Sequence, residues 1–337
     1  MWSDSQTLSP WSHPGKLNEN SISDETDMSA VSANDLAHGA EAVAFYVEQS
    51  LSENTRRAYR SDRAHFEQWA GPVPASEKSI AGYLATYADE LAASTLTRRL
   101  AAIAHAHVTD GYSDPTKGPL VRATLRGIRR TRGTGVSGAK PLRVAELHTI
   151  IATMPDATRD KRDKALLALA FAGGLRRSEL VAFNCEDVSV TSQGMIVQLR
   201  RSKTDQTGSG RAVAIPFGSS NFCPVRMFQD WLSAANIQTG AVFRRVDRCH
   251  RVLPQRLTGD AVSTIVKQRL NAAGIDPTGY SAHSLRAGFV TSAAEAGVPL
   301  WQIRRQTGHN SDAMAAHYIR DVDLFRNNPA AVIWRTN

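Results

Sequence analysis

Apolar residues recur at helical spacing between Glu41 and Arg132, after a polar first stretch without periodicity. Tyr59, Phe66 and Trp69 share one face of the first periodic segment, which is typical of a packed core. The pattern predicts four helices: Thr55–Trp69 with Asn54 as its N-cap, one capped by Ser76, one begun by Ser94 or Thr95, and one opened by Asp114-Pro115.

The pattern changes after Gly138. An almost wholly apolar run from Ala165 to Leu175 predicts a buried helix. Alternation at Met195–Arg200 and Arg211–Pro216 predicts an antiparallel hairpin, whose turn runs from Lys203 to Gly210. The other predicted helices cover Leu142–Met154, Asp163–Ala172, Pro224–Ala235, Gly259–Ala273, Ser281–Ala296, Pro299–Gln306 and Asp312–Phe325, and a short apolar segment, Pro329–Trp334, follows them.

These patterns predict a mainly α fold with one small antiparallel β-sheet, divided into four parts. Residues 1–38 are predicted to be a disordered acidic and polar tail, and residues 39–132 a helical domain. Residues 133–140 form a glycine-rich linker, and residues 141–337 form the second domain.

Charge points to a polyanionic partner. The net charge is +8 over 337 residues, although the first forty residues hold only one lysine against six acidic residues. The rest of the chain is therefore more basic than the total indicates, which favours nucleic acid.

The three cysteines form no CxxC pair, and no run is apolar enough for a secretory segment or a membrane span. We expect a protein of the reducing cytosol, with no structural metal.

Five arginines without an acidic residue among them end the fourth predicted helix. An ordinary solvated helix face mixes both signs of charge, so this run favours a phosphate-binding surface. Its members are Arg122, Arg126, Arg129, Arg130 and Arg132.

The second domain contains an ordered set of residues suited to phosphoryl transfer. Arg176 follows Gly173-Gly174-Leu175, a tight turn from which a guanidinium could grip two phosphate oxygens. Glu179, three residues on, could orient Arg176 or Arg177. No acidic cluster suited to Mg²⁺ lies nearby, so side chains alone would meet the charge of a phosphodiester.

Two more motifs follow. His283 and Arg286 are three residues apart, which places them side by side on one helix face. His309 follows Gly308 at a predicted helix end, and Tyr318 lies on the helix after it. Only about one tyrosine in a thousand is ionised at neutral pH, so nucleophilic attack by Tyr318 would need nearby positive charge or a base.

Lys203, in the predicted hairpin turn, could protonate a departing 5′ oxygen. Arg200, Arg201, Arg211 and His309 are alternatives for that role, and Tyr280 is the alternative nucleophile.

In order and spacing these motifs resemble the tyrosine recombinase (phage integrase) family: Gly-Leu-Arg176-x-Ser-Glu179-Leu, a hairpin lysine at Lys203, His283-x-x-Arg286, Gly-His309 and then Tyr318. The resemblance covers about residues 41–337, because the Asn54–Tyr59 segment and the helices after it are similar to the family's core-binding domain. One departure is Gly173, where members usually have threonine.

The resemblance implies a SAM-like core-binding domain and a catalytic domain that form a C-shaped clamp on a double-stranded DNA recombination site. Tyr318 would form a 3′-phosphotyrosyl link, and a homotetramer would exchange strands through a Holliday junction without metal, ATP or any cofactor. Its place would be the bacterial cytoplasm, with the nucleoid. The expected DNA-binding residues are Arg56, the five helix arginines, Arg200, Arg201 and Arg211.

Two other functions stay open from the sequence. A type IB topoisomerase uses a similar catalytic set, although the apolar Pro329–Trp334 segment favours a multimer over a monomeric relaxing enzyme. A non-catalytic DNA-binding regulator on the same fold would have no reason to keep Tyr318 and both arginines. The target sequence, the biological role, any accessory proteins and whether the C-terminal segment docks on its own domain or on a neighbour are not decided by the sequence.

Overall fold

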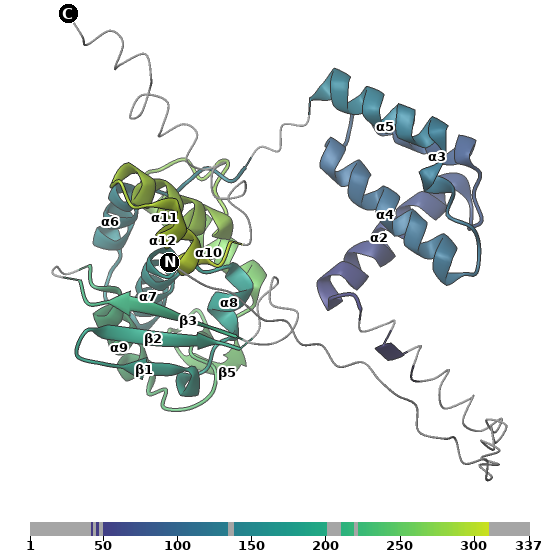
Figure 1. Cartoon of the computed structure of the whole chain (residues 1–337). Helices are drawn as coiled ribbons and strands as arrows, with labels where there is room; N and C mark the ends of the chain where they lie inside the picture. Colours follow the sequence, from purple (N-terminus) through teal and green to yellow (C-terminus); the bar gives the residue numbers. More distant parts are fainter. Residues whose placement is uncertain are drawn as a thin grey trace, which may run out of the picture. The chain divides into compact units, whose positions relative to one another are not determined.

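The structure, a computed structural model, describes residues 42, 45–46, 50–133, 138–200, 210–218 and 222–309. The chain divides into two compact units, Met1–Val136 and Ser137–Asn337, each of which is described by itself (Figure 1). Residues 1–38, Lys203 and the segments Asp312–Phe325 and Pro329–Trp334 lie outside the described residues, as does most of the predicted hairpin turn.

The first unit is helical, as predicted. Its core is built from side chains that recur along each helix, among them Phe66, Ile80, Tyr83 and Leu96, all of which are fully buried. The described elements are α2 (Glu53–Ala70), α3 (Glu77–Thr86), α4 (Ala93–Thr109), a 3₁₀ turn (Pro115–Lys117) and α5 (Pro119–Arg132).

Three of the four described helices in this unit begin differently from the sequence-based prediction. Ser52, not Asn54, caps α2, because its hydroxyl accepts the amide hydrogen of Thr55. Ser76 caps α3 as predicted, but α4 begins at Ala93, without a side-chain cap. Asp114 caps only the 3₁₀ turn, so the last helix starts later, at Pro119.

The second unit combines helices with two small sheets. The buried helix predicted from the apolar run is α7, whose residues from Ala165 to Ala170 are almost inaccessible, and it packs against α9. The helices are α6 (Val144–Thr153), α7 (Thr158–Ala172), α8 (Arg177–Ala182), α9 (Pro224–Ala235), α10 (Gly259–Ala272), α11 (Ala282–Glu295) and α12 (Leu300–Thr307).

The predicted hairpin is present, and an additional strand joins it. β2 (Gly194–Leu199) and β3 (Arg211–Pro216) pair in antiparallel register, with Val197 opposite Val213. β1 (Val188–Val190) adds to the other edge of β2, so the order is β1-β2-β3 (Figure 1). A second, two-stranded sheet of β4 (Arg244–Val246) and β5 (Val252–Arg256) was not predicted. The prediction of a mainly α fold with a small antiparallel sheet is confirmed, with one more sheet than expected.

The segment that leads into α6 lies along α11. The amide of Lys140 donates to the carbonyl of Gly279, and the amide of Leu142 to that of Ser284, both at 2.9 Å. A Cβ atom at Gly288 would lie 1.7 Å from the Leu142 carbonyl oxygen, so only glycine allows this approach. The helix predicted to carry His283 and Arg286 is therefore held by the first residues of its own unit.

Candidate active site

A glycine turn places Arg176 at the start of α8. Gly174 has φ +54°, and a Cβ there would lie 2.7 Å from Cγ2 of Thr307, so both the backbone and the space require glycine. Leu175 is buried behind the turn. Arg176 is the residue before α8 and projects from this fixed base, as the sequence predicted.

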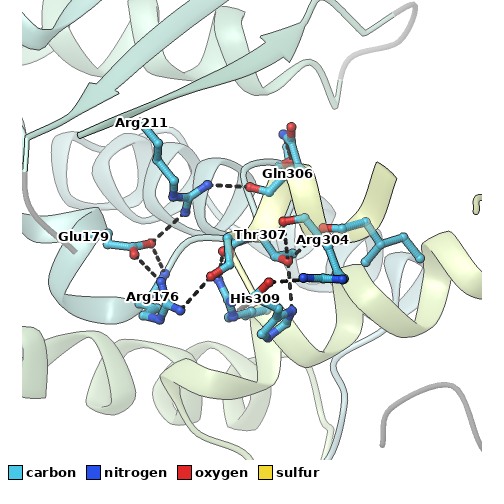
Figure 2. Close-up of polar contacts among 12 residues, drawn as sticks. Arg176, Glu179, Arg211, Arg304, Gln306, Thr307 and His309 are labelled. Atoms are coloured by element: carbon cyan, nitrogen blue, oxygen red, sulfur yellow. Dashed lines mark hydrogen bonds and ion pairs between the residues drawn. The ribbon is translucent and has the colours of Figure 1, made fainter. Parts of the chain in front are cut away.

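Glu179 orients Arg176 rather than Arg177. Its Oε1 accepts from Nη1 of Arg176 at 2.6 Å, and its Oε2 accepts from the Arg176 backbone amide at 2.9 Å. A second guanidinium nitrogen, Nη2 of Arg176, donates to the carbonyl of Gly308 at 3.0 Å (Figure 2). Arg177 instead pairs with Asp260 near the surface. The guanidinium plane of Arg176 is therefore set from two sides.

Arg286 lies on α11 and joins two turns of the site. It is 2% exposed, and its Nη1 donates to the carbonyls of Gly174 and Thr307, both at 2.6 Å. His283 lies one helical turn earlier and keeps an exposed surface. The atoms packed around its ring, and then the charges of Arg286 and Arg176, lower the pKa of His283 below its usual 6.5.

His309 follows the left-handed Gly308 that ends α12. The Thr307 hydroxyl donates to the carbonyl of Ile303 at 2.7 Å and lies 2.9 Å from Nδ1 of His309. We therefore assign the ring proton to Nδ1, which gives Nε2 the acceptor role. Burial, and then the charges of Arg286 and Arg176, lower the pKa of His309 to about 3, so the ring is neutral at neutral pH.

The cluster carries an excess of positive charge. Glu179 is its one buried carboxylate among the described residues, and it faces both Arg176 and Arg211. After burial, which is the larger cause, the charges of Arg286 and Arg176 lower the pKa of both histidines. An anion with one charge and several acceptor oxygens, such as a phosphodiester, would offset that positive charge.

The other predicted site residues have different surroundings. The five helix arginines are exposed along α5, opposite the buried Val121, Leu125 and Ile128; Arg129 donates to Thr97, and Arg132 pairs with Asp89. Arg56 pairs with Glu53 on its own helix, and Arg200 pairs with Asp187. The structure places Arg211 inside the cluster instead of on the surface. Lys203, Arg201 and Tyr318 lie outside the described residues.

Sequence reasoning missed two members of the cluster. Thr307 fixes the His309 ring, and Gln306 offers its carbonyl to Nη1 of Arg211 at 2.7 Å. Both residues lie in the last turn of a helix that ends in Gly-His. Carbonyls in a last turn lack partners within the helix, so this position could have indicated contacts to the site.

Neither a membrane segment nor a metal cluster is found in the described ranges. No helix there is long and apolar enough to cross a membrane. Nor do three histidine, cysteine, aspartate or glutamate side chains gather there in a way that could hold a metal ion.

Comparison with known proteins agrees with this geometry. The phage integrase family model matches residues 140–323, and the model of the phage integrase N-terminal SAM-like domain matches residues 44–107. The chain is 38% identical over 293 residues to the integrase/recombinase xerD homolog of Selenomonas ruminantium, which covers 84% of this chain and 86% of that protein. It is 24% identical over 300 residues to the recombinase cre of Escherichia phage P1, covering 82% and 86%.

Among solved structures, the Tn1549 transposon integrase in complex with transposon right end DNA has the same fold, with a TM-score of 0.60 at 15% identity over 85% of this chain and 97% of that one. The family match spans both described units, and the xerD homolog aligns over most of both chains. The chain therefore belongs to the phage integrase family of tyrosine recombinases, the site-specific recombinases that break and rejoin DNA.

Proposed function

We propose that this recombinase cleaves one DNA strand by attack of the Tyr318 phenolic oxygen on the scissile phosphate. A bond forms between that oxygen and phosphorus, the bond from phosphorus to the 5′ oxygen breaks, and a 3′-phosphotyrosyl link and a 5′ hydroxyl result. The supporting observation is the convergence of Arg176, Arg286, His283 and His309 on one positively charged site. Type IB topoisomerase activity and non-catalytic DNA binding are less well supported, because the relatives are recombinases.

The proposed step moves two protons, one from Tyr318 and one to the 5′ oxygen. The Tyr318 proton goes to the ring of His309 or to that of His283, both of which are unprotonated at neutral pH, and the negative charge of the bound phosphate raises the low pKa of these rings and so their basicity. Arg176 and Arg286 hold the non-bridging oxygens as negative charge develops on them. Lys203 gives a proton to the 5′ oxygen. These groups account for every charge and proton in the step, so we propose that neither a metal ion nor ATP takes part.

The two units share the proposed work. Residues 39–132 serve as a core-binding domain, residues 133–140 as linker and residues 141–337 as the catalytic domain. Arg122, Arg126 and Arg130 support DNA binding by the first domain, since they are exposed and make no ion pair with a described residue. Together the domains would clamp the DNA, and a homotetramer would complete strand exchange through a Holliday junction.

The direct test is to incubate the protein with DNA that carries its recombination site, in EDTA and without ATP, and then to denature it. Recovery of a covalent protein–DNA adduct supports the proposal. Complete dependence of the adduct on added metal would contradict its metal-free form.

The Lys203→Ala variant should cleave normal DNA slowly and cleave DNA with a 5′-bridging sulfur at close to the wild-type rate. A sulfur leaving group needs no proton, so loss of the general acid should no longer matter. Single-turnover cleavage of both substrates measures this. Lys161→Ala, which removes a lysine paired with Asp156, is the control and should match wild type on both. Equal slowness of Lys203→Ala on both substrates would move the role to Arg200, Arg201, Arg211 or His309.

An apolar pocket in the catalytic unit supports assembly through the chain's C-terminal segment. It has a volume of about 570 Å³, and Leu147, Ile151, Phe171, Phe222 and Val298 are among its lining residues. Exposed apolar surface that is bordered by polar residues often marks a protein-docking site. Pro329–Trp334, which ends in an Ile-Trp pair, is the segment that we propose fills the pocket of a neighbouring protomer.

Truncation after Asn328 should leave the melting temperature and single-site DNA affinity unchanged but abolish cooperative assembly and complete recombination. Gel-shift titration and thermal unfolding of the free protein separate these effects. Trp334→Ala should weaken assembly in the same way. Trp301→Ala, which removes a 61% exposed tryptophan that does not line the pocket, should not. A truncated protein whose main defect is a lower melting temperature would place the segment in its own domain.

A further inference from the structure

Arg211, the first residue of β3, is the third arginine of the active-site cluster. It follows Lys203 by eight residues at the far end of the hairpin turn. Its Nη2 donates to Oε2 of Glu179 at 3.1 Å, and its Nη1 donates to the carbonyl of Gln306 at 2.7 Å (Figure 2). The side chain therefore joins the sheet to both α8 and α12.

The carboxylate of Glu179 is divided between two arginines. Arg176 takes Oε1 through its Nη1, and Arg211 takes Oε2 through its Nη2. A carboxylate held at both oxygens cannot rotate about its last bond without breaking an ion pair. Oε2 also accepts from the backbone amide of Arg176, so Arg211 and this amide together fix the position of Glu179, which sets the guanidinium of Arg176.

Gly308 is the second link between the two arginines. A Cβ atom at Gly308 would lie 2.9 Å from Nε and 3.1 Å from Cζ of Arg211, so the guanidinium of Arg211 rests against the bare backbone of this turn. The carbonyl of Gly308 accepts from Nη2 of Arg176. Arg211 therefore contacts both Glu179 and Gly308, the two residues that hold the Arg176 guanidinium. His309 directly follows Gly308 in the chain.

Stability alone gives a poor account of this arrangement. The side chain of Arg211 is 20% exposed, and its buried Nε has no hydrogen-bond partner among the described residues. Burial lowers the pKa of Arg211, and Glu179 offsets part of that effect. A buried charge with an unused donor is costly, and apolar replacements of buried ion pairs are often as stable. The contacts of Arg211 are better explained by the positions in which they hold Glu179 and the Gly308 turn.

We propose that Arg211 is a positioning residue for DNA cleavage, which fixes Glu179 and the Gly308 turn and through them sets Arg176 and His309. The contacts of its Nη atoms lie within the protein, so Arg211 acts through these neighbours and not through the DNA. Through Arg211, strand β3 also helps to align Arg176. This strand is one arm of the hairpin that contains Lys203. This inference rests on the proposed role of Arg176.

The first test compares Arg211→Met and Arg211→Lys in single-turnover cleavage and in site affinity. Both variants should cleave about 10- to 100-fold more slowly, the scale expected when a catalytic group is displaced by up to about 1 Å. Site affinity should stay within about threefold, because no DNA contact is lost. Lysine should not rescue the rate, since it lacks the fork that reaches both Glu179 and Gln306.

Arg244→Met is the matched control. Arg244 is also the first residue of a strand and also donates to backbone carbonyls, those of Ala241 and Thr239, but it lies outside the cluster. Its replacement should leave the cleavage rate of the folded protein unchanged. Thermal unfolding of each variant shows how much protein is folded at the assay temperature.

A double-mutant cycle separates positioning from a general structural role. In a Glu179→Gln background, Arg211→Met should cost much less than in the wild type, because the link through which it acts is already broken. Gly308→Ala should slow cleavage more than Gly274→Ala. Both glycines have positive φ (+67° and +74°), but a Cβ at Gly274 would meet nothing within 4 Å.

Three results would overturn the inference. The first is cleavage at the wild-type rate by Arg211→Met. The second is that Arg211→Met slows cleavage as much in the Glu179→Gln background as in the wild type. The third is that Arg211→Met weakens DNA affinity and leaves the cleavage rate unchanged. Arg176→Lys distinguishes these from failure of the proposed function. If Arg176→Lys cleaves normally, the role of Arg176 is wrong, whereas a slow Arg176→Lys beside a normal Arg211→Met refutes only the role of Arg211.

Discussion

Tyr318→Phe should abolish the covalent protein–DNA adduct and leave DNA binding intact. The substitution removes one phenolic oxygen and no other atom, so the fold and the charged surfaces stay as they are. Without that oxygen the scissile phosphate has no nucleophile. Denaturing gel analysis of the adduct, together with a gel-shift measurement of affinity, tests both halves of this expectation.

Tyr280→Phe is the matched control for this experiment. The Tyr280 hydroxyl donates to Oε1 of Glu146 at 2.7 Å, and burial followed by this bond raises the pKa of Tyr280. A buried phenol with a raised pKa is a poor nucleophile. The Tyr280→Phe variant should therefore still form the adduct. An adduct that survives denaturation in the Tyr318→Phe protein would refute the assignment and direct attention to Tyr280.

Arg176→Lys and Arg286→Lys should each slow cleavage by about 10² to 10³, or about 3–4 kcal/mol of transition-state stabilisation. Lysine keeps the charge but not the planar fork, and so it should be nearly as damaging as alanine. Arg286→Lys should also lower the melting temperature, because Nη1 of Arg286 bridges the carbonyls of Gly174 and Thr307. Single-turnover cleavage rates and thermal unfolding measure the two effects.

Arg177→Lys is the control next in the chain. Arg177 is half-exposed and pairs with Asp260 outside the cluster, so its lysine variant should cleave at close to the wild-type rate. Wild-type rates for Arg176→Lys and Arg286→Lys would rule out the phosphate clamp. Equal losses for all three variants would show a general sensitivity to charge rather than a specific site.

The longer helices were predictable because each buries one continuous apolar face. α9 begins and ends where the sequence indicated, and α7 was identified by its apolar run, although it starts five residues earlier, at Thr158. The β4–β5 sheet was not predicted, because its short strands are rich in arginine and have no fully buried residue to mark a face. Ser52 and Asn54 are both good N-caps, and local sequence does not decide between them.

The order of the site motifs was predictable, but the part that Arg211 plays was not. In the sequence it lies ten residues after Arg201, at the other end of the predicted turn, and with Arg200 and Arg201 it indicates a basic surface. Its burial depends on Glu179 and Gln306, which are 32 and 95 residues away in the chain. Contacts at that separation come from tertiary packing, and no local pattern encodes them.

The contact between Leu142 and Gly288 has a consequence for when the enzyme becomes active during its own synthesis. The two residues lie near opposite ends of the described part of the catalytic unit, so their pairing closes one of its longest loops and belongs to the slow class of folding events. A growing chain exposes Leu142 long before the ribosome releases α11, and domains fold from the N-terminal side as they emerge. Until α11 docks, Arg286 cannot join the turns at Gly174 and Thr307. Under the proposed mechanism, a nascent or prematurely terminated chain that ends before α11 therefore lacks the assembled phosphate site and cannot cleave DNA.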